Sequence, residues 1–319
     1  MNTPHAPRVV AVVVAYNRRD LLREALDAIL LQSMPVAAVV VVDNASSDDS
    51  AQVALAAGSR VDLVRLSVNT GGAGGFAAGI ARALERHEPD WIWLMDDDTI
   101  PTQSALEMLH AGASASEAVV AGSRVVWTDG AEHPMNTPRR RPFASRKEQA
   151  LAASAGGFVI RSTSFVSMLA RADAVRAAGL PLADFFIWND DFEYSTRLLR
   201  HARGVFVPSS VVVHKTRVLG STDADPGDRF YYEVRNKLWM FRGSKSLSVG
   251  EKVLYGASTL RRWVRTVRRS SDRPVVAQAF RRGWRDGWRT TPRSTTAVLA
   301  GLEGALEVES VERAALWPR

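Results

Sequence analysis

The chain has 319 residues, of which 46% are hydrophobic and 24% charged, a globular composition that supports one large domain or a domain with an appendage. It has a formal net charge of +7 and no cysteine, which excludes disulfides, thiolate metal sites and cysteine nucleophiles and fits a reducing cytosol. No apolar run approaches the roughly 20 residues that a membrane-spanning helix requires, and the first valine-rich run lacks signal-peptide flanks. We therefore expect a protein that is not secreted.

Short β-branched runs alternate with helical patterns in the first half of the chain, as in a βαβ array. The expected strands there are 9–15, 36–42, 61–66 and 91–95, and the expected helices are 20–31, 50–57, 75–85 and 104–113. Short strands are expected again at 156–160, 164–169, 205–207 and 211–213, followed by basic helices from about residue 228. Residues 128–150 predict a loop, either mobile and near a substrate entrance or an ordinary surface loop. This order predicts an α/β fold with a mixed, mostly parallel sheet flanked by helices.

Three consecutive aspartates, Asp96, Asp97 and Asp98, follow the apolar run Trp91–Met95. Adjacent carboxylates repel one another, so a folded protein rarely keeps three together without a compensating cation. The carboxyl end of a buried strand is where open α/β sheets place their ligands. Oxygen ligands on one short turn suit Mg²⁺ or Mn²⁺, ions that are commonly shared with substrate phosphates. A solvated acidic turn is the alternative for an isolated triplet, but the preceding strand favours a metal site.

Two further polar segments follow predicted strands. Asp43 ends the second strand, where a carboxylate can accept hydrogen bonds from ribose hydroxyls or a base N–H. Residues 69–76 read Asn-Thr-Gly-Gly-Ala-Gly-Gly-Phe, and such glycines let backbone amides approach a pyrophosphate. The segment loosely imitates a dinucleotide fingerprint, which belongs after the first strand with an acidic residue about 20 positions on. Because that context is missing, a dehydrogenase is disfavoured.

A second acidic cluster lies at residues 188–194 and opens a predicted helix. The helix dipole alone would explain Asp190 and Asp191, but the flanking aromatic residues would also enclose a carboxylate that acts as a general base. Two separated carboxylate sites, one for a cation and one for a base, indicate transfer from a phosphate-activated donor to a hydroxyl. His214 ends a later strand and is either a structural residue or a further Mn²⁺ ligand.

Together these segments resemble the inverting family 2 glycosyltransferases of the GT-A fold over roughly residues 8–240. The shared motifs are Val14-Ala15-Tyr16-Asn17-Arg18, Asp43-Asn44-Ala45-Ser46, the glycine segment, the triple aspartate, Asp190-Asp191-Phe192-Glu193 and the downstream His214. Ala178-Gly179-Leu180-Pro181 and Tyr231-Tyr232-Glu233-Val234-Arg235-Asn236 are similar to the rhamnosyl- and galactofuranosyl-transferase branch. The triple aspartate, Trp188 and His214 most resemble the actinobacterial enzymes that start the cell-wall galactan. Ala15 stands where many members carry threonine.

The resemblance implies a role for each matched residue. A divalent ion, Mn²⁺ or Mg²⁺, bridging the donor diphosphate would be bound by Asp96, Asp98 and His214. Asp97 would touch the donor sugar or share the metal. The nucleoside would be held by Tyr16, Arg18 and Asp43, and the diphosphate would lie beside Asn69, Gly74 and Gly75. Asp191 would be the catalytic base, and the acceptor site would be shaped by Trp188 and Asp190.

The resemblance also implies the reaction. Galactofuranose would pass from UDP-galactofuranose to a polyprenyl-diphosphate-linked saccharide, which would initiate the galactan of cell-wall arabinogalactan. Asp191 would deprotonate the acceptor hydroxyl in a single, inverting, metal-dependent displacement. The alternative within the same fold is a rhamnosyltransferase that uses dTDP-rhamnose. The alternative from another class is a nucleotide-sugar-binding protein that has lost catalysis, and the presence of every expected carboxylate argues against it.

The basic charge is concentrated near the C-terminus, since residues 235–289 hold 15 Lys and Arg against three acidic residues. Around residues 250–269, apolar residues mark one helix face and arginines crowd the remainder, and this basic region also contains Trp263, Trp284 and Trp288. Basic helices with interfacial tryptophans attach to anionic bilayers without spanning them. Packing within the protein or an oligomer is the alternative, and nucleic-acid binding is disfavoured because no nucleic-acid motif accompanies the charge.

These patterns predict the organisation of the chain and its location. A GT-A glycosyltransferase domain would span residues 1–227, with a nucleotide-sugar half to about residue 125 and an acceptor half over 126–227. Residues 228–319 would form a basic helical extension. We expect a cytoplasmic protein held peripherally on the inner face of the cell membrane.

Overall fold

The computed structural model describes residues 6–216, 219 and 225–316. Parallel strands alternate with helices in the first third of the chain: β1 (Val9–Ala15), α1 (Arg19–Leu30), β2 (Ala38–Asn44), α2 (Ser50–Ala56), β3 (Val61–Leu66), α3 (Gly71–Arg86) and β4 (Trp91–Asp96). The middle third contains β5 (Thr99–Pro101), α4 (Ala105–Ala115), β6 (Val120–Val126), β7 (Arg139–Arg140), α5 (Arg146–Ser154), β8 (Phe158–Ser162), β9 (Met168–Arg171), α6 (Ala172–Ala178), α7 (Asp190–Leu198) and β10 (Gly204–His214). Short 3₁₀ helices occupy Phe165–Ser167, Ala183–Phe185 and Gly227–Arg229.

Within the described residues, ten strands form one mixed sheet in the order β3-β2-β1-β4-β9-β6-β10-β8-β7, and β5 pairs with β10. Strands β1 to β4 are parallel where they pair, whereas β9 runs antiparallel to both of its neighbours, β4 and β6. The strand order turns around at β1, which lies between β2 and β4. In open α/β sheets the ligand site lies outside the carboxyl ends of the strands at this kind of position. The predicted mixed, mostly parallel α/β fold is confirmed.

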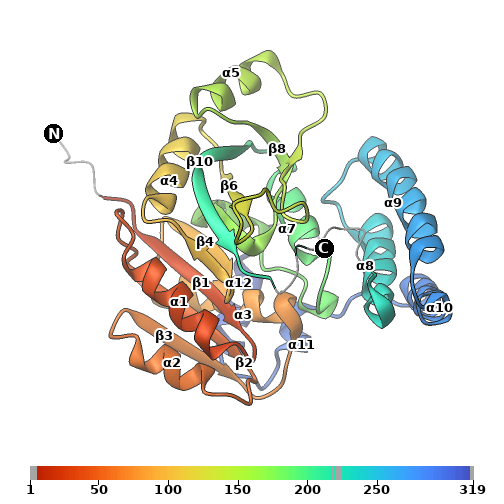
Figure 1. The fold of residues 1–319 in the computed structure, drawn as a ribbon, viewed down its shortest axis with the longest axis horizontal. Coiled ribbons are helices and arrows are strands. Elements are labelled where there is room, and N and C mark those ends of the chain that lie inside the picture. Colours follow the sequence, from red (N-terminus) through yellow and green to blue (C-terminus); the bar gives the residue numbers. More distant parts are fainter. Residues whose placement is uncertain (1–5, 217–218, 220–224, 317–319) are drawn as a thin grey trace.

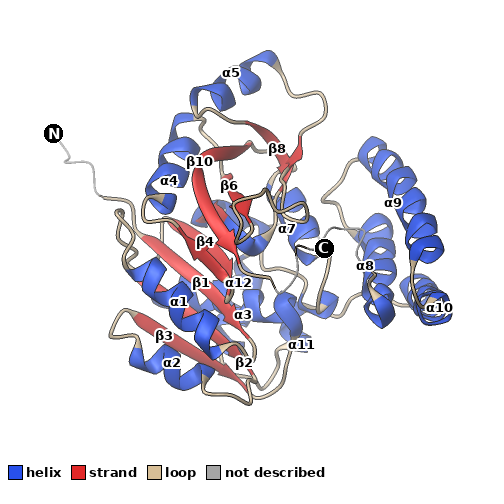
Figure 2. Cartoon of the chain, viewed as in Figure 1, coloured by secondary structure: helices blue, strands red, loops and turns tan. Residues whose placement is uncertain are grey.

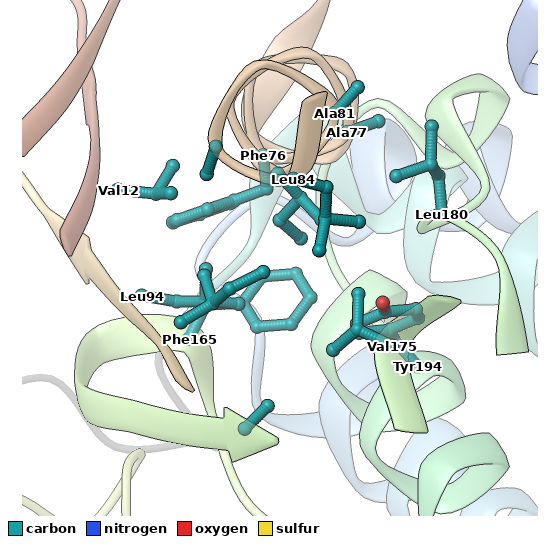
Figure 3. Close-up of a cluster of buried hydrophobic side chains, with 14 of the residues drawn as sticks. Val12, Phe76, Ala77, Ala81, Leu84, Leu94, Phe165, Val175, Leu180 and Tyr194 are labelled. Atoms are coloured by element: carbon teal, nitrogen blue, oxygen red, sulfur yellow. The ribbon is translucent and has the colours of Figure 1, made fainter. Parts of the chain in front are cut away.

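Helices cover both faces of the sheet (Figure 2). All seven residues of β1 are buried, and alternate residues serve opposite cores. Val10 and Val12 join the core beneath α3, whereas Val9 and Val13 join the core beneath α1 and α4. Figure 3 shows the first of these cores, where α3 side chains meet residues from β1, β4, α6 and α7. A strand buried on both faces has a continuous apolar sequence, which explains the valine runs.

The second half of the sheet departs from the predicted elements. The expected strand at 164–169 is a 3₁₀ turn followed by β9, and the two strands expected around Pro208 are one strand, β10, with a register irregularity between Val207 and Val211. Strand β6 was not predicted, because Gly122, Ser123 and Arg124 interrupt its apolar pattern. The segment expected to be a loop, 128–150, contains strand β7 and the first five residues of helix α5. A helix was expected at 75–85, but α3 begins four residues earlier, so the glycine segment is helical.

The C-terminal helices are α8 (Phe230–Gly243), α9 (Val249–Arg269), α10 (Arg273–Arg289), α11 (Thr295–Val298) and α12 (Ala305–Ala314). Helices α8, α9 and α10 pack with one another at the side of the sheet remote from β3 (Figure 1). Helix α12 returns to α3, where Arg82 bonds to Glu303 and Glu307 at 2.7 and 2.9 Å. None of the described helices combines the length and the hydropathy needed to span a bilayer.

Candidate active site

The carboxyl ends of the central strands bring three metal-ligating side chains together. Asp96 is the last residue of β4 and pairs in register with Val14 of β1. Strand β5 then turns back and pairs with β10, which sets His214 opposite Thr99 and therefore beside Asp98. One ligand atom each from Asp96, Asp98 and His214 lies within 4.8 Å of the others. The sheet thus assembles these three predicted metal ligands, although His214 is 116 residues beyond Asp98.

The charge of the aspartates is balanced by neighbouring cations. Arg18 forms an ion pair with Asp98, and its Nη1 also lies 3.4 Å from Asp97 Oδ1. Burial would raise the pKa of Asp98, but His214 and Arg18 lower it below its ordinary value. Burial, followed by the charge of Asp98, raises the pKa of Asp96 to about 6. The cluster therefore favours binding a cation over keeping three free carboxylates ionised.

The chemistry of these residues fits a divalent ion. Asp98 Oδ1 is buried and lies 3.1 Å from His214 Nε2, yet no hydrogen bond with good geometry reaches it among the described residues. A buried carboxylate oxygen of this kind is suited to metal ligation, and two carboxylates with one imidazole suit Mn²⁺ well. Asp97 lies outside this cluster, because its Oδ2 accepts the backbone N–H of Tyr16 at 3.0 Å. This position of the Asp97 carboxylate does not favour metal binding, which was one of the two roles predicted for Asp97.

Asn136 holds His214 from behind, an interaction that the sequence did not indicate. His214 Nδ1 lies 3.0 Å from Asn136 Oδ1, which leaves Nε2 facing Asp98. The Asn136 amide is in turn fixed by its Nδ2 donating to Ser164 Oγ at 3.2 Å. A metal-ligating histidine depends on such a partner to set its ring orientation and its tautomer.

Replacing Asn136 with Ala is expected to weaken Mn²⁺ binding about 10- to 100-fold, because His214 loses the group that orients it. The measurement is a Mn²⁺ titration followed by electron paramagnetic resonance of the free ion. Gln149→Ala serves as the control, because this amide lies on α5 and, among the described residues, its side chain bonds only to the nearby backbone of Ala144. Equal Mn²⁺ affinity in the two variants would show that Asn136 does not orient the ligand.

The residues predicted to hold the nucleotide surround the same strand ends. Tyr16 is half-exposed directly after β1, and Asp43 is buried at the end of β2, where Oδ1 accepts the Ser46 amide at 3.0 Å. Asn69 precedes α3 and accepts the Gly71 amide. Gly74 and Gly75 have another evident purpose, because added Cβ atoms would lie 2.4 Å from Thr70 and 2.6 Å from Val14. Their contribution to close packing of α3 is clear, and a diphosphate role for them remains a prediction.

The predicted base and acceptor residues lie on an unusual turn before α7. Phe186, Trp188 and Asn189 all have φ between 63° and 68°, a left-handed conformation that is uncommon for residues other than glycine. Three such residues in four positions concentrate backbone strain, which folded proteins tolerate mainly at functional sites. The turn presents Asp190 and Asp191 at the N-terminus of α7. Burial raises the pKa of Asp191, which favours its use as a base near neutral pH.

Helix α8 holds this turn in place. Asn236 Nδ2 donates to the carbonyl groups of Phe185, Ile187 and Trp188 at 2.9 to 3.0 Å. Asn189 is fixed by its own side chain, which donates to Glu233 at 2.8 Å. Two residues of the motif at 231–236 therefore have a structural explanation: Asn236 satisfies backbone carbonyls of the strained turn, and Glu233 fixes the Asn189 side chain.

A single cavity of about 470 Å³ connects the two carboxylate sites. Its lining includes Asp96 and His214 from the metal cluster and Trp188, Asp190 and Asp191 from the turn. Gly72 also lines this cavity, and a Cβ there would lie 3.9 Å from the Asp190 carboxylate. One cavity therefore holds a cation site and a candidate general base, the arrangement required to activate a phosphate leaving group and a hydroxyl nucleophile together.

Comparison with known sequences agrees with this chemistry. The profile of Glycosyl transferase family 2 matches residues 10–176. Galactofuranosyltransferase GlfT1 of Mycolicibacterium smegmatis is 34% identical over 205 residues, which cover 61% of this chain and 67% of the relative. GlfT1 of Mycobacterium tuberculosis is 29% identical over 266 residues, which cover 78% of this chain and 87% of the relative.

Solved structures share the fold at lower identity. Residues 1–349 of S. aureus TarS match with a TM-score of 0.61 at 14% identity, covering 96% of this chain and 90% of that one. The mannosyltransferase PcManGT of Pyrobaculum calidifontis, solved with GDP-Man and Mn²⁺, matches with a TM-score of 0.56 at 18% identity, covering 98% and 81%. Because the family profile spans more than half of the chain, the protein belongs to glycosyl transferase family 2 and is a glycosyltransferase of the GT-A fold.

Proposed function

We propose that this glycosyltransferase moves galactofuranose from UDP-galactofuranose to a polyprenyl-diphosphate-linked saccharide, and so initiates a cell-wall galactan. The observation that carries this proposal is the one cavity that holds both the Asp96–Asp98–His214 cluster and Asp191. The donor assignment is supported by the similarity to two galactofuranosyltransferases over most of the chain.

The positions of the side chains support the following proposed roles. Asp96, Asp98 and His214 would hold a divalent ion, and that ion, when bound, would supply positive charge to the departing diphosphate. Tyr16, Arg18 and Asp43 lie around the strand ends where the nucleoside would bind. Asp191 would accept the proton of the acceptor hydroxyl as that oxygen attacks the anomeric carbon, and Trp188 and Asp190 would orient the acceptor. A single displacement of this kind inverts the anomeric centre.

The test is UDP release in the presence of Mn²⁺ with a synthetic polyprenyl-diphosphate disaccharide as acceptor. Turnover with UDP-galactofuranose alone is the expected result. Turnover with dTDP-rhamnose instead, measured as dTDP release, would retain the fold and the mechanism but overturn the donor assignment. Absence of turnover with every donor, together with intact UDP binding, would favour a nucleotide-sugar-binding protein that lacks catalysis.

We also propose that helix α9 attaches the enzyme to the inner face of the cell membrane. Several of its apolar residues face solvent, with Val253 69% and Leu260 57% exposed, whereas Trp263 on an adjacent face is buried. Arginines flank this face, and Trp284 and Trp288 of α10 are also partly exposed. An exposed apolar stripe bordered by arginines suits the interface of an anionic bilayer. Among the described residues, no intramolecular packing buries these apolar side chains.

Cosedimentation with anionic liposomes tests this attachment. The double variant Val253→Glu/Leu260→Glu is expected to lose most of its binding, because it places charge on the apolar face without disturbing a buried contact. Leu55→Glu is the matched control, since Leu55 is 67% exposed on α2. Binding of the wild type should weaken at high salt. Absence of salt-sensitive binding by the wild type, or equal loss in both variants, would overturn the proposal and favour an oligomer contact.

A further inference from the structure

A second cavity, of about 280 Å³, lies beside the first and is bounded by β7, α8 and α9. It shares Arg139 and Arg262 with the larger cavity. Its full lining is Arg139, Lys237, Tyr255, Ser258, Thr259, Arg261, Arg262 and Arg265. Five of these eight residues are basic and none is acidic, so the cavity has the composition of an anion site.

Lys237 is the most informative member of this group. It is only 2% exposed, and Nζ lies 3.8 Å from the centre of the Phe192 ring. No ion pair or hydrogen bond to its ammonium group occurs within the described part of the chain. Burial lowers the pKa of Lys237 to about 7; the negative charges of Glu233 and Asp191 oppose this shift, and the positive charges of Arg139 and Arg262 add to it. A buried ammonium group without an ion pair is costly, and an anion bound beside it would favour its charged form.

Arg139 and Arg140 form the short strand β7 and point in different directions. The Arg139 guanidinium lies 4.9 Å from the Phe192 ring centre and 5.9 Å from that of Tyr255 and lines the basic cavity, although the residue as a whole is exposed. The Arg140 guanidinium instead stacks on Phe158 at 3.7 Å and lines neither cavity. Arg262 has a carboxylate partner, Glu233, whereas Arg139 has none within the described residues. Arg139 and Lys237 together therefore supply positive charge that the protein itself does not neutralise by ion pairing.

The position of this charge indicates which anion it would serve. Arg139 lines both this cavity and the larger cavity that holds Asp191, so the basic cavity adjoins the acceptor side of the site. On its other side, α9 carries the exposed apolar face formed by Val253 and Leu260. A molecule with a sugar at Asp191 and a lipid chain along α9 would have to pass through the basic cavity. The donor diphosphate, by contrast, has its proposed cation at the Asp96–Asp98–His214 cluster.

We propose that Arg139 and Lys237 bind the diphosphate of the lipid-linked acceptor and thereby select a diphosphate carrier over a neutral glycoside. This inference rests on the proposed acceptor class and adds the site that recognises its charged group. The recognition is electrostatic, and it places the saccharide beyond the diphosphate at Asp191. No covalent step occurs in this cavity.

The first experiment measures binding without turnover. Geranyl diphosphate, geranyl monophosphate and inorganic pyrophosphate are titrated by calorimetry into the full chain, with UDP and Mn²⁺ at saturation so that the donor site is filled. Arg139→Gln is expected to weaken geranyl diphosphate binding about tenfold or more, and Arg140→Gln to leave it unchanged. Equal affinity in the two variants, or no binding by the wild type, would overturn the proposal.

Comparison of the three probes also shows whether the cavity binds the diphosphate of a lipid or a free phosphate anion. A lipid-linked acceptor site should bind geranyl diphosphate more tightly than the monophosphate, and more tightly than inorganic pyrophosphate, because the prenyl chain adds contacts along α9. Pyrophosphate binding equal to that of geranyl diphosphate would show a site for free phosphates and would overturn the assignment to a lipid carrier.

Lys237→Met is a second test variant, for which both Tm and geranyl diphosphate binding are measured. Removing an unpaired buried ammonium while keeping its apolar volume is expected to leave Tm equal to or above that of the wild type, and to weaken geranyl diphosphate binding about tenfold. A marked fall in Tm without a change in binding would show that Lys237 is structural, and would count against the proposal.

Kinetics distinguish failure of this inference from failure of the proposed function. The same disaccharide is offered as a polyprenyl diphosphate and as a neutral octyl glycoside. Arg139→Gln should raise KM about tenfold for the diphosphate acceptor alone, and Arg140→Gln for neither. An equal rise for both acceptors would overturn the inference even if UDP-galactofuranose proves to be the donor. If another donor is used instead, the binding experiment still decides the role of the cavity.

Discussion

Replacing Asp191 with Asn is expected to lower kcat about 10²- to 10⁴-fold, the range that a general base contributes. The amide keeps the size of the carboxylate and a hydrogen-bonding oxygen, so the turn before α7 should retain its conformation. Asp191 is not part of the Asp96–Asp98–His214 cluster, so affinities for UDP and Mn²⁺ should remain within about twofold. Steady-state kinetics with the diphosphate acceptor, together with calorimetric titration of UDP, provide the measurement.

Asp27→Asn is a suitable control, because Asp27 is exposed on α1 outside the cavity and should leave kcat unchanged. Loss of UDP affinity in Asp191→Asn as large as the loss of kcat would contradict the assignment of Asp191 as the base. Retention of wild-type kcat would do so as well, and would assign the strained turn to acceptor binding alone.

Replacing Arg161 with Met is expected to lower the free energy of unfolding by about 3–5 kcal/mol, the cost of breaking a buried ion pair from one side. Arg161 lies in β8 and is 2% exposed. Its guanidinium donates to Glu251 of α9 and, at 2.6 Å each, to the carbonyl groups of Thr196 and Ser246. The substitution would remove this donor from the Thr196 and Ser246 carbonyl groups and the cationic partner from Glu251, and would loosen α9 from β8.

Urea denaturation followed by circular dichroism measures this loss. Arg171→Met is the matched control, because the Arg171 side chain is 47% exposed and pairs only with the neighbouring Asp173, so its cost should stay within about 0.5 kcal/mol. Equal stability of the two variants would contradict the role given to Arg161.

The same ion pair makes the stability depend on pH. Burial would raise the pKa of Glu251, but hydrogen bonds from Arg161 and Ser248 outweigh burial and lower that pKa to about 2. The contribution of this pair should therefore be fully present above about pH 4.5 and be lost as the pH falls toward 2.

The strands and helices of the N-terminal part of the fold, from β1 to β4, could be predicted from the sequence because the patterns that indicate them are local. Strands β1, β2 and β4 are buried on both faces, so their valine- and tryptophan-rich runs stand out without knowledge of their neighbours. The sequence also located the carboxylates that follow these strands, because parallel strands direct their carboxyl ends to one edge. Strand β6 was not predicted, because its small and polar residues are explained only by contacts with residues far along the chain. Gly122 packs against Thr163, and Ser123 bonds to Ser167.

The sequence by itself therefore determined the fold class, the family and the candidate carboxylates, since each depends on residue type and order. Only the tertiary structure decided which of them meet. Pairing of β5 with β10 brings His214 to Asp98, and Asn136 orients it from a segment that lacks periodicity. The packing of α8 and α9 beside β7 gathers Arg139 and Lys237 into one cavity, whereas their spacing of 98 residues carries no local signal. Such sites arise from packing between distant elements, and the energy of that packing is not encoded in any short stretch of sequence.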